Sequence, residues 1–244
     1  MTTQFLGAVL LPYLAIAAAA LLLGKYGGRA RGLVARWVFA LMLFAGIAKQ
    51  IVAVRTGVWH TMVPLHFSST FYLTVGCSVF AKNFLRRAGQ SLLFVSGVLM
   101  TVVLFVDPVA VLGDPALVFT SHIRAHGYFF HMAAAFQMFV LLFSGEMSLG
   151  RYDAHIFALF VAAWCALAIP GAFYFHINFM GILVSYIPLL ERLRLAAGTP
   201  LYLTVCYSLL VLSVYAFLFV CKKLSRMPVF RAKKRTLRKV EPLF

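Results

Sequence analysis

The chain has 244 residues, of which 63% are hydrophobic, and it carries only six acidic side chains against 22 basic ones. Its mean hydropathy of +0.95 excludes an ordinary soluble domain and indicates a polytopic membrane protein. The net charge of +16 does not indicate nucleic-acid binding, because the lysines and arginines stand between apolar runs and in the tail, where the positive-inside rule places them.

Seven apolar runs have about the 20 residues that a helix needs to cross a hydrocarbon core about 30 Å thick. The first run is too long for a signal-peptide core and lacks preceding basic residues, so we expect a retained helix. The sequence therefore predicts an all-α fold, with a single transmembrane domain over 1–221 and a basic cytoplasmic tail over 222–244. The predicted spans are 5–23, 37–54, 59–80, 91–112, 118–143, 154–175 and 200–221.

The stretch 179–190 is apolar but too short to span a membrane, and Pro188 and the charged residues after it end the run. We expect this stretch on the surface or as a re-entrant piece. Four cysteines lie in apolar runs at unrelated spacings, which favours buried apolar side chains over a disulfide framework or a thiolate metal site. They are Cys77, Cys165, Cys206 and Cys221.

The distribution of basic residues predicts the orientation. Seventeen of the 22 lie in alternate connections, at 24–36, 81–90 and Arg151, and in the tail, whereas the opposite ends carry four. The positive-inside rule then places the N-terminus outside and the tail in the cytoplasm, across a cell membrane of the bacterial inner-membrane type. The tail itself either anchors this topology or binds anionic lipid headgroups.

Polar side chains gather in the outer halves of the predicted spans. At a rise of 1.5 Å per residue, His66 and Ser68 lie about 10 to 14 Å below the outer boundary, and His126 lies about 12 Å below it. Ionisable residues at such depths normally face a bundle interior and indicate a functional site. We therefore predict a polar cavity open toward the outer leaflet. The outer ends of other spans add Lys49, Gln50, Asp107, His176 and Asn178.

Two prolines fall beside these polar residues. Pro64 stands two residues before His66, and Pro108 follows Asp107. A proline within a span leaves a carbonyl without its helical partner. The two positions therefore indicate either a simple kink or irregular backbone that lines a cavity.

Ser68 is the predicted nucleophile and His126 its predicted base, because a serine hydroxyl needs an adjacent base and His126 matches its depth. The alternative for a serine in a membrane helix is packing or a hydrogen bond to its own backbone. Ser69 or Thr70 could replace it as the nucleophile. On an ideal helix His66 shares a face with Ser69 and Thr70 and lies about 200° from Ser68.

Zinc and haem are the alternatives that need a cofactor. His122 and His126 share a helix face, whereas His131 is rotated away and is predicted to be an interhelical hydrogen-bonder. This spacing resembles the integral membrane ceramidases and adiponectin-receptor-like hydrolases, whose late-helix ligands only His176 could supply. A haem held by His66 and a histidine of 118–143 is disfavoured, because a dihaem protein needs paired histidines on two helices. The predicted zinc ligands are His66, Asp107, His122 and His126.

The segment Pro64-Leu65-His66-Phe67-Ser68, followed by Ala125-His126-Gly127, resembles the YwaF-like family of bacterial integral membrane proteins. In that family Pro-Leu-His-Leu-Cys opens the third helix, an aspartate near a proline closes the fourth, and Ala/Ser-His-Gly lies early in the fifth. Asn178-Phe179-Met180 is similar to the family's Asn-Tyr-Met/Phe segment after the sixth helix. The resemblance covers roughly 59–180.

Relatives of this family include a vertebrate acyltransferase that builds ether phospholipids through a cysteine and a histidine. More distant relatives are the androgen-induced hydrolases, which use a threonine and a histidine. The resemblance implies that Ser68 occupies the nucleophile position and His126 the base position. Here serine replaces the family's cysteine, and a hydroxyl depends more on its base because it is far less ionised than a thiol.

We therefore expect a cofactor-free lipid acyltransferase or lipid-ester hydrolase that acts on a membrane lipid. Ser68 would form an acyl-enzyme with His126 as base. The alternatives are a zinc-dependent membrane hydrolase and a non-catalytic transporter or lipid-binding protein whose cavity holds a headgroup or an ion. The residues predicted to support the reaction, as oxyanion donors or by orienting a histidine, are Lys49, Gln50, His66, Asp107, His122 and Asn178.

Overall fold

The computed structural model describes residues 6–108, 111, 118, 120–147, 149–150, 152–185 and 187–224, and within them all regular structure is helical. Five helices of this part of the chain are long and apolar enough to cross a membrane. The prediction of an all-helical chain with several membrane-length apolar helices is confirmed. These five are α3 (Gly28–Arg55), α5 (Asn83–Val106), α7 (His122–Ser144), α8 (Asp153–Phe175) and α10 (Thr199–Leu224).

The first two helices meet in a turn much tighter than expected. A π-helical turn, η1 (Leu6–Leu10), leads into α2 (Leu11–Tyr26), and α3 already begins at Gly28, which has φ +48°. The predicted connection over 24–36 is therefore wrong. Arginine forms helices well, so α3 extends through the arginines that precede its apolar run. The apolar run shows which part of a helix suits lipid, but it does not show where the helix begins or ends.

The third predicted span is not one helix. It consists of two 3₁₀ turns, η2 (Trp59–Met62) and η3 (Phe67–Ser69), followed by α4 (Thr70–Phe80). Val63 has a ψ angle of 129°, because the ring of Pro64 disfavours helical backbone in the residue before it, and His66 is extended as well, with a ψ angle of 149°. The prediction of a continuous helix over 59–80 is wrong, and so are the depths calculated for it from a helical rise. We call residues 59–69 the broken segment.

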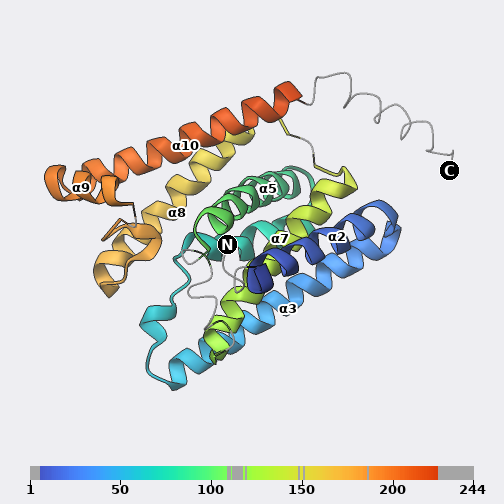
Figure 1. The fold of residues 1–244 in the computed structure, drawn as a ribbon, viewed down its shortest axis with the longest axis horizontal. Helices are drawn as coiled ribbons and strands as arrows, with labels where there is room; N and C mark the ends of the chain where they lie inside the picture. The colour runs from blue at the N-terminus through green and yellow to red at the C-terminus, as the bar shows by residue number, and fades with distance from the viewer. Residues whose placement is uncertain are drawn as a thin grey trace.

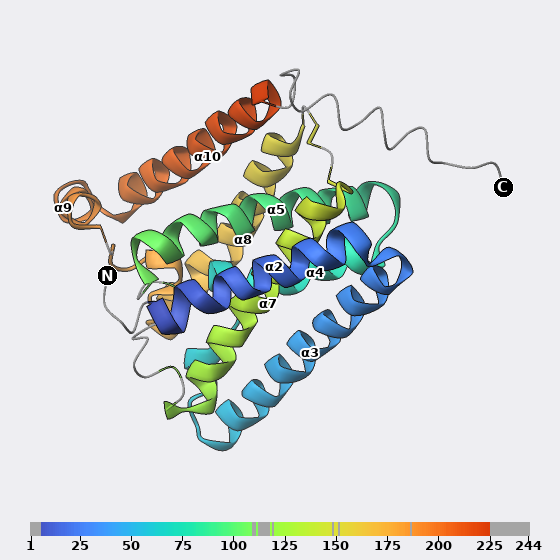
Figure 2. The same ribbon diagram turned by 45° about the vertical axis from the view of Figure 1, so that its right-hand side comes forward.

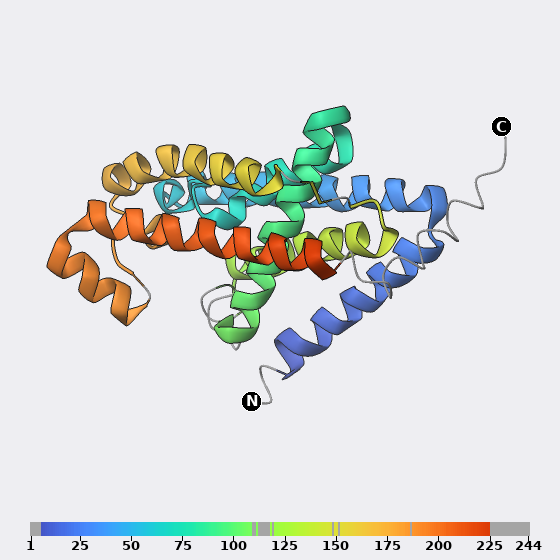
Figure 3. The same ribbon diagram turned by 90° about the horizontal axis from the view of Figure 1, so that it is seen from above.

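Helix α7 is central to the packing. Helices α2, α3, α4 and α5 contact it, α5 also contacts α8, and α8 packs against α10 (Figures 1 and 2). Figure 3 shows α8 and α10 side by side, with α2 on the far side of the molecule. The main core holds Phe71, Leu93 and Met138, all almost fully buried.

A smaller apolar cluster joins the broken segment to α8. It is built on Ala168, Ala172 and Phe179, and Leu65 packs against it. The indole Nε1–H of Trp164 donates to the carbonyl oxygen of Leu65 at 3.3 Å. Gly171 leaves room for the Leu65 side chain, since a methyl group at Gly171 would overlap Leu65 Cδ1. The broken segment is therefore fixed to α8 at Leu65.

Three ion pairs bring the ends of four helices together. Arg31 of α3 and Arg86 of α5 pair with Glu146 at 2.6 and 3.2 Å, and Arg87 pairs with buried Asp153 at 3.6 Å. The N-terminal ends of α3, α5 and α8 and the C-terminal end of α7 therefore lie on one side. We call this side the basic end.

The stretch after α8 forms a 3₁₀ turn, η5 (Phe179–Gly181), and a ten-residue helix, α9 (Pro188–Ala197), in which no residue is buried. Helix α9 agrees with the surface position expected for 179–190, whereas the start of that stretch does not, because Phe179 and Ile182 are buried in the smaller apolar cluster. Glu191 accepts hydrogen bonds from Arg194 at 2.5 and 2.9 Å and from the backbone N–H of Ser185 at 2.7 Å. These bonds lower the pKa of Glu191 from its ordinary 4.5 to about 2.

We expect acid to release the loop before α9. A carboxyl whose pKa is lowered in the folded protein stabilises the fold above its unfolded pKa, and this contribution is lost as the pH falls from about 4.5 toward 2. The measurement is the hydrogen-exchange protection of the Ser185 amide, corrected for its intrinsic rate. In Glu191→Gln this protection should not change over the same pH range. An identical pH dependence in the two proteins would contradict the assignment.

Candidate active site

A cavity of about 220 Å³ lies between the C-terminal part of α3, the broken segment, α4 and the start of α7. It brings together Lys49, Gln50, His66, Ser68 and His126, which the sequence analysis singled out. We call it the hydroxyl–histidine cavity.

The backbone of the broken segment decides which side chains reach this cavity. Because the chain is extended at His66, both His66 and Ser68 line the cavity, although an ideal helix would turn them apart. Ser69 lines it as well. Thr70 is fully buried, donates to the carbonyl oxygen of Phe67 at 2.7 Å and does not line the cavity, so it is no alternative nucleophile.

Helix α7 lines the cavity with His126, Gly127, Phe130 and His131, which form one stripe along the helix. The prediction that His131 is turned away and bonds between helices is therefore wrong. Its Nδ1 lies 2.6 Å from the carbonyl oxygen of Gly127, one turn earlier in the same helix. A carbonyl only accepts, so we infer that Nδ1 carries the proton and that Nε2 is the acceptor.

His126 has one partnered and one unpartnered ring nitrogen. Its Nε2 lies 3.4 Å from the hydroxyl of Tyr72, and its ring stacks on Phe130 with the centroids 5.7 Å apart. Its Nδ1 is buried and has no hydrogen-bond partner in the described part of the chain. No hydrogen bond joins Ser68 to His126 among these residues. Catalytic hydrogen bonds are often longer in a free enzyme than in its substrate complex.

Lys49 gives the cavity its charge. None of the described residues that line the cavity is acidic, and Lys49 acts electrostatically on His66, His126 and His131. Lys49 is half-buried and donates no hydrogen bond within the residues described. The cavity is therefore electropositive, which suits an anionic group or a developing oxyanion.

Three of the predicted supporting residues do not line this cavity. Asp107 follows the last turn of α5 and His122 begins α7, and both side chains are exposed. The amide of Asn178 holds its own loop: it donates to Val184 at 2.8 Å and accepts from Leu183 and Val184 at 2.9 and 3.0 Å. These three residues therefore do not lie in the cavity, in contrast to the prediction.

The predicted zinc ligands are not brought together either. Of the four, only His66 and His126 line the cavity. Within the described residues no group of three or more His, Cys, Asp or Glu side chains is arranged to hold a metal ion.

Sequence reasoning missed Tyr72 and Gly46, which shape the cavity around His126. Helical spacing was the available signal, because Tyr72 lies one turn after Ser68 and Gly46 lies one turn before Gln50. Gly46 is buried and leaves room for the Tyr72 ring, since a methyl group there would overlap its hydroxyl and lie 2.9 Å from Cζ.

We expect Gly46→Ala to push Tyr72 away from His126 and to lower the free energy of unfolding by about 1–3 kcal/mol, as overpacking does. In the Tyr72→Phe background the same change should cost less, because the overlapping oxygen is gone. Thermal unfolding of the four proteins in a double-mutant cycle measures this coupling. Strictly additive changes would mean that Gly46 does not make room for the hydroxyl.

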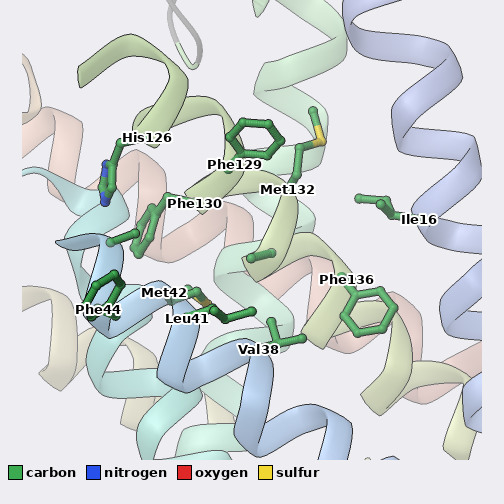
Figure 4. Close-up of a pocket in the computed structure, with 12 residues that line it drawn as sticks. Ile16, Val38, Leu41, Met42, Phe44, His126, Phe129, Phe130, Met132 and Phe136 are labelled. Atoms are coloured by element: carbon green, nitrogen blue, oxygen red, sulfur yellow. The ribbon is translucent and has the colours of Figure 1, made fainter. Parts of the chain in front are cut away.

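Two apolar grooves adjoin the hydroxyl–histidine cavity. The first, of about 560 Å³, shares His126 and Phe130 with it. Figure 4 shows His126 at one end of this groove, beside Phe130, with apolar side chains along the rest. The second, of about 530 Å³, lies along α3 and shares Gly46, Gln50, Pro64 and Tyr72 with the cavity.

Comparisons with known proteins add no relative: no protein-family model, curated protein or solved structure matches the chain. The fold and the site themselves define the class. This is an all-helical protein with membrane-length apolar helices and a polar cavity of hydroxyl, imidazole and ammonium groups beside two apolar grooves.

Proposed function

We propose that this protein is a membrane enzyme that transfers or hydrolyses the acyl group of a lipid ester. The observation that carries the proposal is the shared cavity of Ser68 and His126, which belong to separate segments, beside an uncompensated Lys49. A hydroxyl can serve as the nucleophile of acyl transfer, an imidazole as its base, and a cation as the group that stabilises the oxyanion.

The proposed reaction has two steps. The Ser68 oxygen attacks the ester carbonyl and passes its proton to His126, and a tetrahedral oxyanion forms that the Lys49 ammonium stabilises. The bond to the lipid alcohol then breaks, and His126 returns the proton to that alcohol. In the second step water or an acceptor alcohol attacks the acyl-serine by the reverse proton path, which frees Ser68.

The bonds around His126 are compatible with this role. We assign the tautomer in which Nε2–H donates to the Tyr72 oxygen, which leaves the lone pair of Nδ1 to accept the proton. In the structure Nδ1 is the nitrogen without a described partner. Tyr72 would then orient the imidazole.

The apolar grooves support a lipid as the substrate. Each groove meets the polar cavity directly, one at His126 and the other at Tyr72. An ester held in the cavity would therefore have an apolar path for its acyl chain on either side. Burial of a chain contributes about 0.8 kcal/mol for each CH₂ group.

The same proposal includes the family resemblance, the seven spans and their orientation in a cell membrane. The broken segment with α4, and η1 with α2, would supply the two spans beyond the five long helices. Ion pairs that gather Arg31, Arg86 and Arg87 at one end support the alternation on which the orientation depends. An impermeant thiol reagent should then modify Trp59→Cys, and not Lys25→Cys, in intact cells.

A serine-reactive phosphonate with a lipid-like chain tests the enzymatic proposal. It should label the purified protein at one site, which peptide mass spectrometry should identify as Ser68. Ser68→Ala should abolish the labelling and His126→Ala should slow it. Ser213→Ala is the matched control, because Ser213 is exposed on α10 and donates to its own helix at Leu210.

Two results would replace the proposal. Folded protein that is never labelled and that contains one zinc ion per chain would be a metal-dependent hydrolase. Folded protein that is never labelled, contains no metal and binds lipid without turnover would be a lipid-binding or transport protein.

A further inference from the structure

A second polar cavity, of about 160 Å³, lies at the basic end between α3, α4, α5 and α7. Its charged lining residues are Arg31, Arg36, Arg86 and Glu146, and we call it the arginine pocket. It is separate from the hydroxyl–histidine cavity, because the 13 residues of α3 from Arg36 to Lys49 span about 20 Å.

The charges of this pocket do not balance. Glu146 pairs with both Arg31 and Arg86, so one carboxylate serves two guanidinium groups. Arg36 is exposed and forms no ion pair within the described part of the chain. Three arginines against one glutamate leave the arginine pocket with a surplus of two positive charges.

The polar lining and the volume of the arginine pocket also limit which ligands it can hold. Neutral polar side chains from three helices line the pocket beside the arginines. Liquid water occupies about 30 Å³ per molecule, so the pocket has room for several water molecules or for one phosphate group. The lining residues of this kind are Ser78, Gln90, Gln137 and Ser144.

Glu146 already occupies the position of an anion. A guanidinium group matches both carboxylate and phosphate oxygens in a fork geometry, and two such groups converge on the Glu146 carboxylate. Basic pockets between transmembrane helices at the cytoplasmic surface are suited to lipid phosphates.

We infer that the arginine pocket binds a phosphate group, carried either by an anionic lipid headgroup or by a small free phosphate. Arg36 supplies the unpaired guanidinium, and Arg31 and Arg86 turn from Glu146 to the ligand. Glu146 therefore competes with the phosphate. This inference concerns the end of the molecule opposite the proposed catalytic site and does not depend on the proposed reaction.

Ligand-induced stabilisation of the full-length protein in a neutral detergent tests the inference, because a ligand that binds only the folded state raises the unfolding midpoint. The probes are inorganic phosphate, short-chain phosphatidylglycerol and, as the neutral lipid control, short-chain phosphatidylcholine. Stabilisation by phosphatidylglycerol alone identifies a lipid headgroup. Stabilisation by inorganic phosphate as well identifies the phosphate group itself as sufficient.

Two substitutions should move the dissociation constant in opposite directions. Arg36→Gln should raise it at least about fivefold, the factor expected when one basic residue at an anionic surface is lost. Glu146→Gln should lower it about as much, because it removes the competing carboxylate. Arg29→Gln is the matched control: Arg29 lies at the same end of α3 and does not line the pocket, so the constant should not change.

Three results would overturn the inference. They are equal stabilisation by the three probes or by none of them, equal weakening by Arg29→Gln and Arg36→Gln, and weaker binding in a folded Glu146→Gln protein. The Glu146→Gln measurement keeps the test decisive if Arg36→Gln does not fold. Neutralising a Glu146 with a purely structural role would not tighten phosphate binding.

Discussion

Ser68→Ala is expected to reduce turnover of a lipid ester by about 10⁴-fold or more, the order of loss when a serine nucleophile is removed from an acyl-transfer site. His126→Ala should cost about as much, and the double variant little more than either single one, because the two groups act as one unit. The measurement is single-turnover release of the acyl chain from a fluorescent phospholipid by the purified protein.

Ser68→Cys is the informative companion variant. A thiolate is a strong nucleophile that depends less on its base, so this protein should retain turnover and become sensitive to a thiol-alkylating reagent. The unmodified protein has four cysteines, none of which lines the hydroxyl–histidine cavity, and its turnover should resist the same reagent. Full turnover by a folded Ser68→Ala protein would rule out the serine mechanism.

The largest expected effect on stability is at Gly89, where α5 packs against α4. A methyl group at Gly89 would lie 2.6 Å from Cys77 Cβ and 2.7 Å from the backbone nitrogen of Ser78. The side chain cannot move aside, because the obstacle includes the backbone of the neighbouring helix. Small residues allow such close approach between membrane helices, and we expect Gly89→Ala to lower the free energy of unfolding by about 3 kcal/mol.

Gly7→Ala is the control for Gly89→Ala, since nothing lies within 4 Å of a methyl group added at Gly7. Thermal unfolding in the same detergent should show a large loss for Gly89→Ala and a change of less than about 1 kcal/mol for Gly7→Ala. Equal stability of the two variants would mean that α4 and α5 are not in close contact at this position.

The sequence predicts the middle of each long helix better than its ends. Hydrophobic length identified α5, α7, α8 and α10, because about 20 apolar residues are what a spanning helix requires. It could not locate the start of α3, because Arg29 and Arg31 are polar and still favour helix. The hydrophobic composition of a segment shows whether it suits the lipid core. The ends of a helix depend instead on the backbone preferences of the residues there.

The candidate site was predictable in its chemistry and not in its backbone. Residue type and spacing led to His66, Ser68 and His126, all of which line one cavity. One step of this prediction was wrong, because the depth of His66 was calculated for a continuous helix, which Pro64 interrupts. Pro64 signalled an irregularity, but sequence alone does not decide between a kink and a broken helix.

Side chains with a nearby backbone partner were the hardest to predict. Asn178 has polar atoms that suit an oxyanion hole, yet they are used by the loop that follows it. His131 bonds within its own turn and still lines the cavity. Such choices depend on which partner is within reach, which requires the coordinates.

The attachment of Leu65 to α8 makes the wall of the cavity at His66 depend on a helix that does not itself line the cavity. Leu65 is held by Trp164 and lodged beside Gly171, and His66 is the next residue along the chain. A substitution at Trp164 or Gly171 that shifts Leu65 would therefore displace the imidazole of His66 as well.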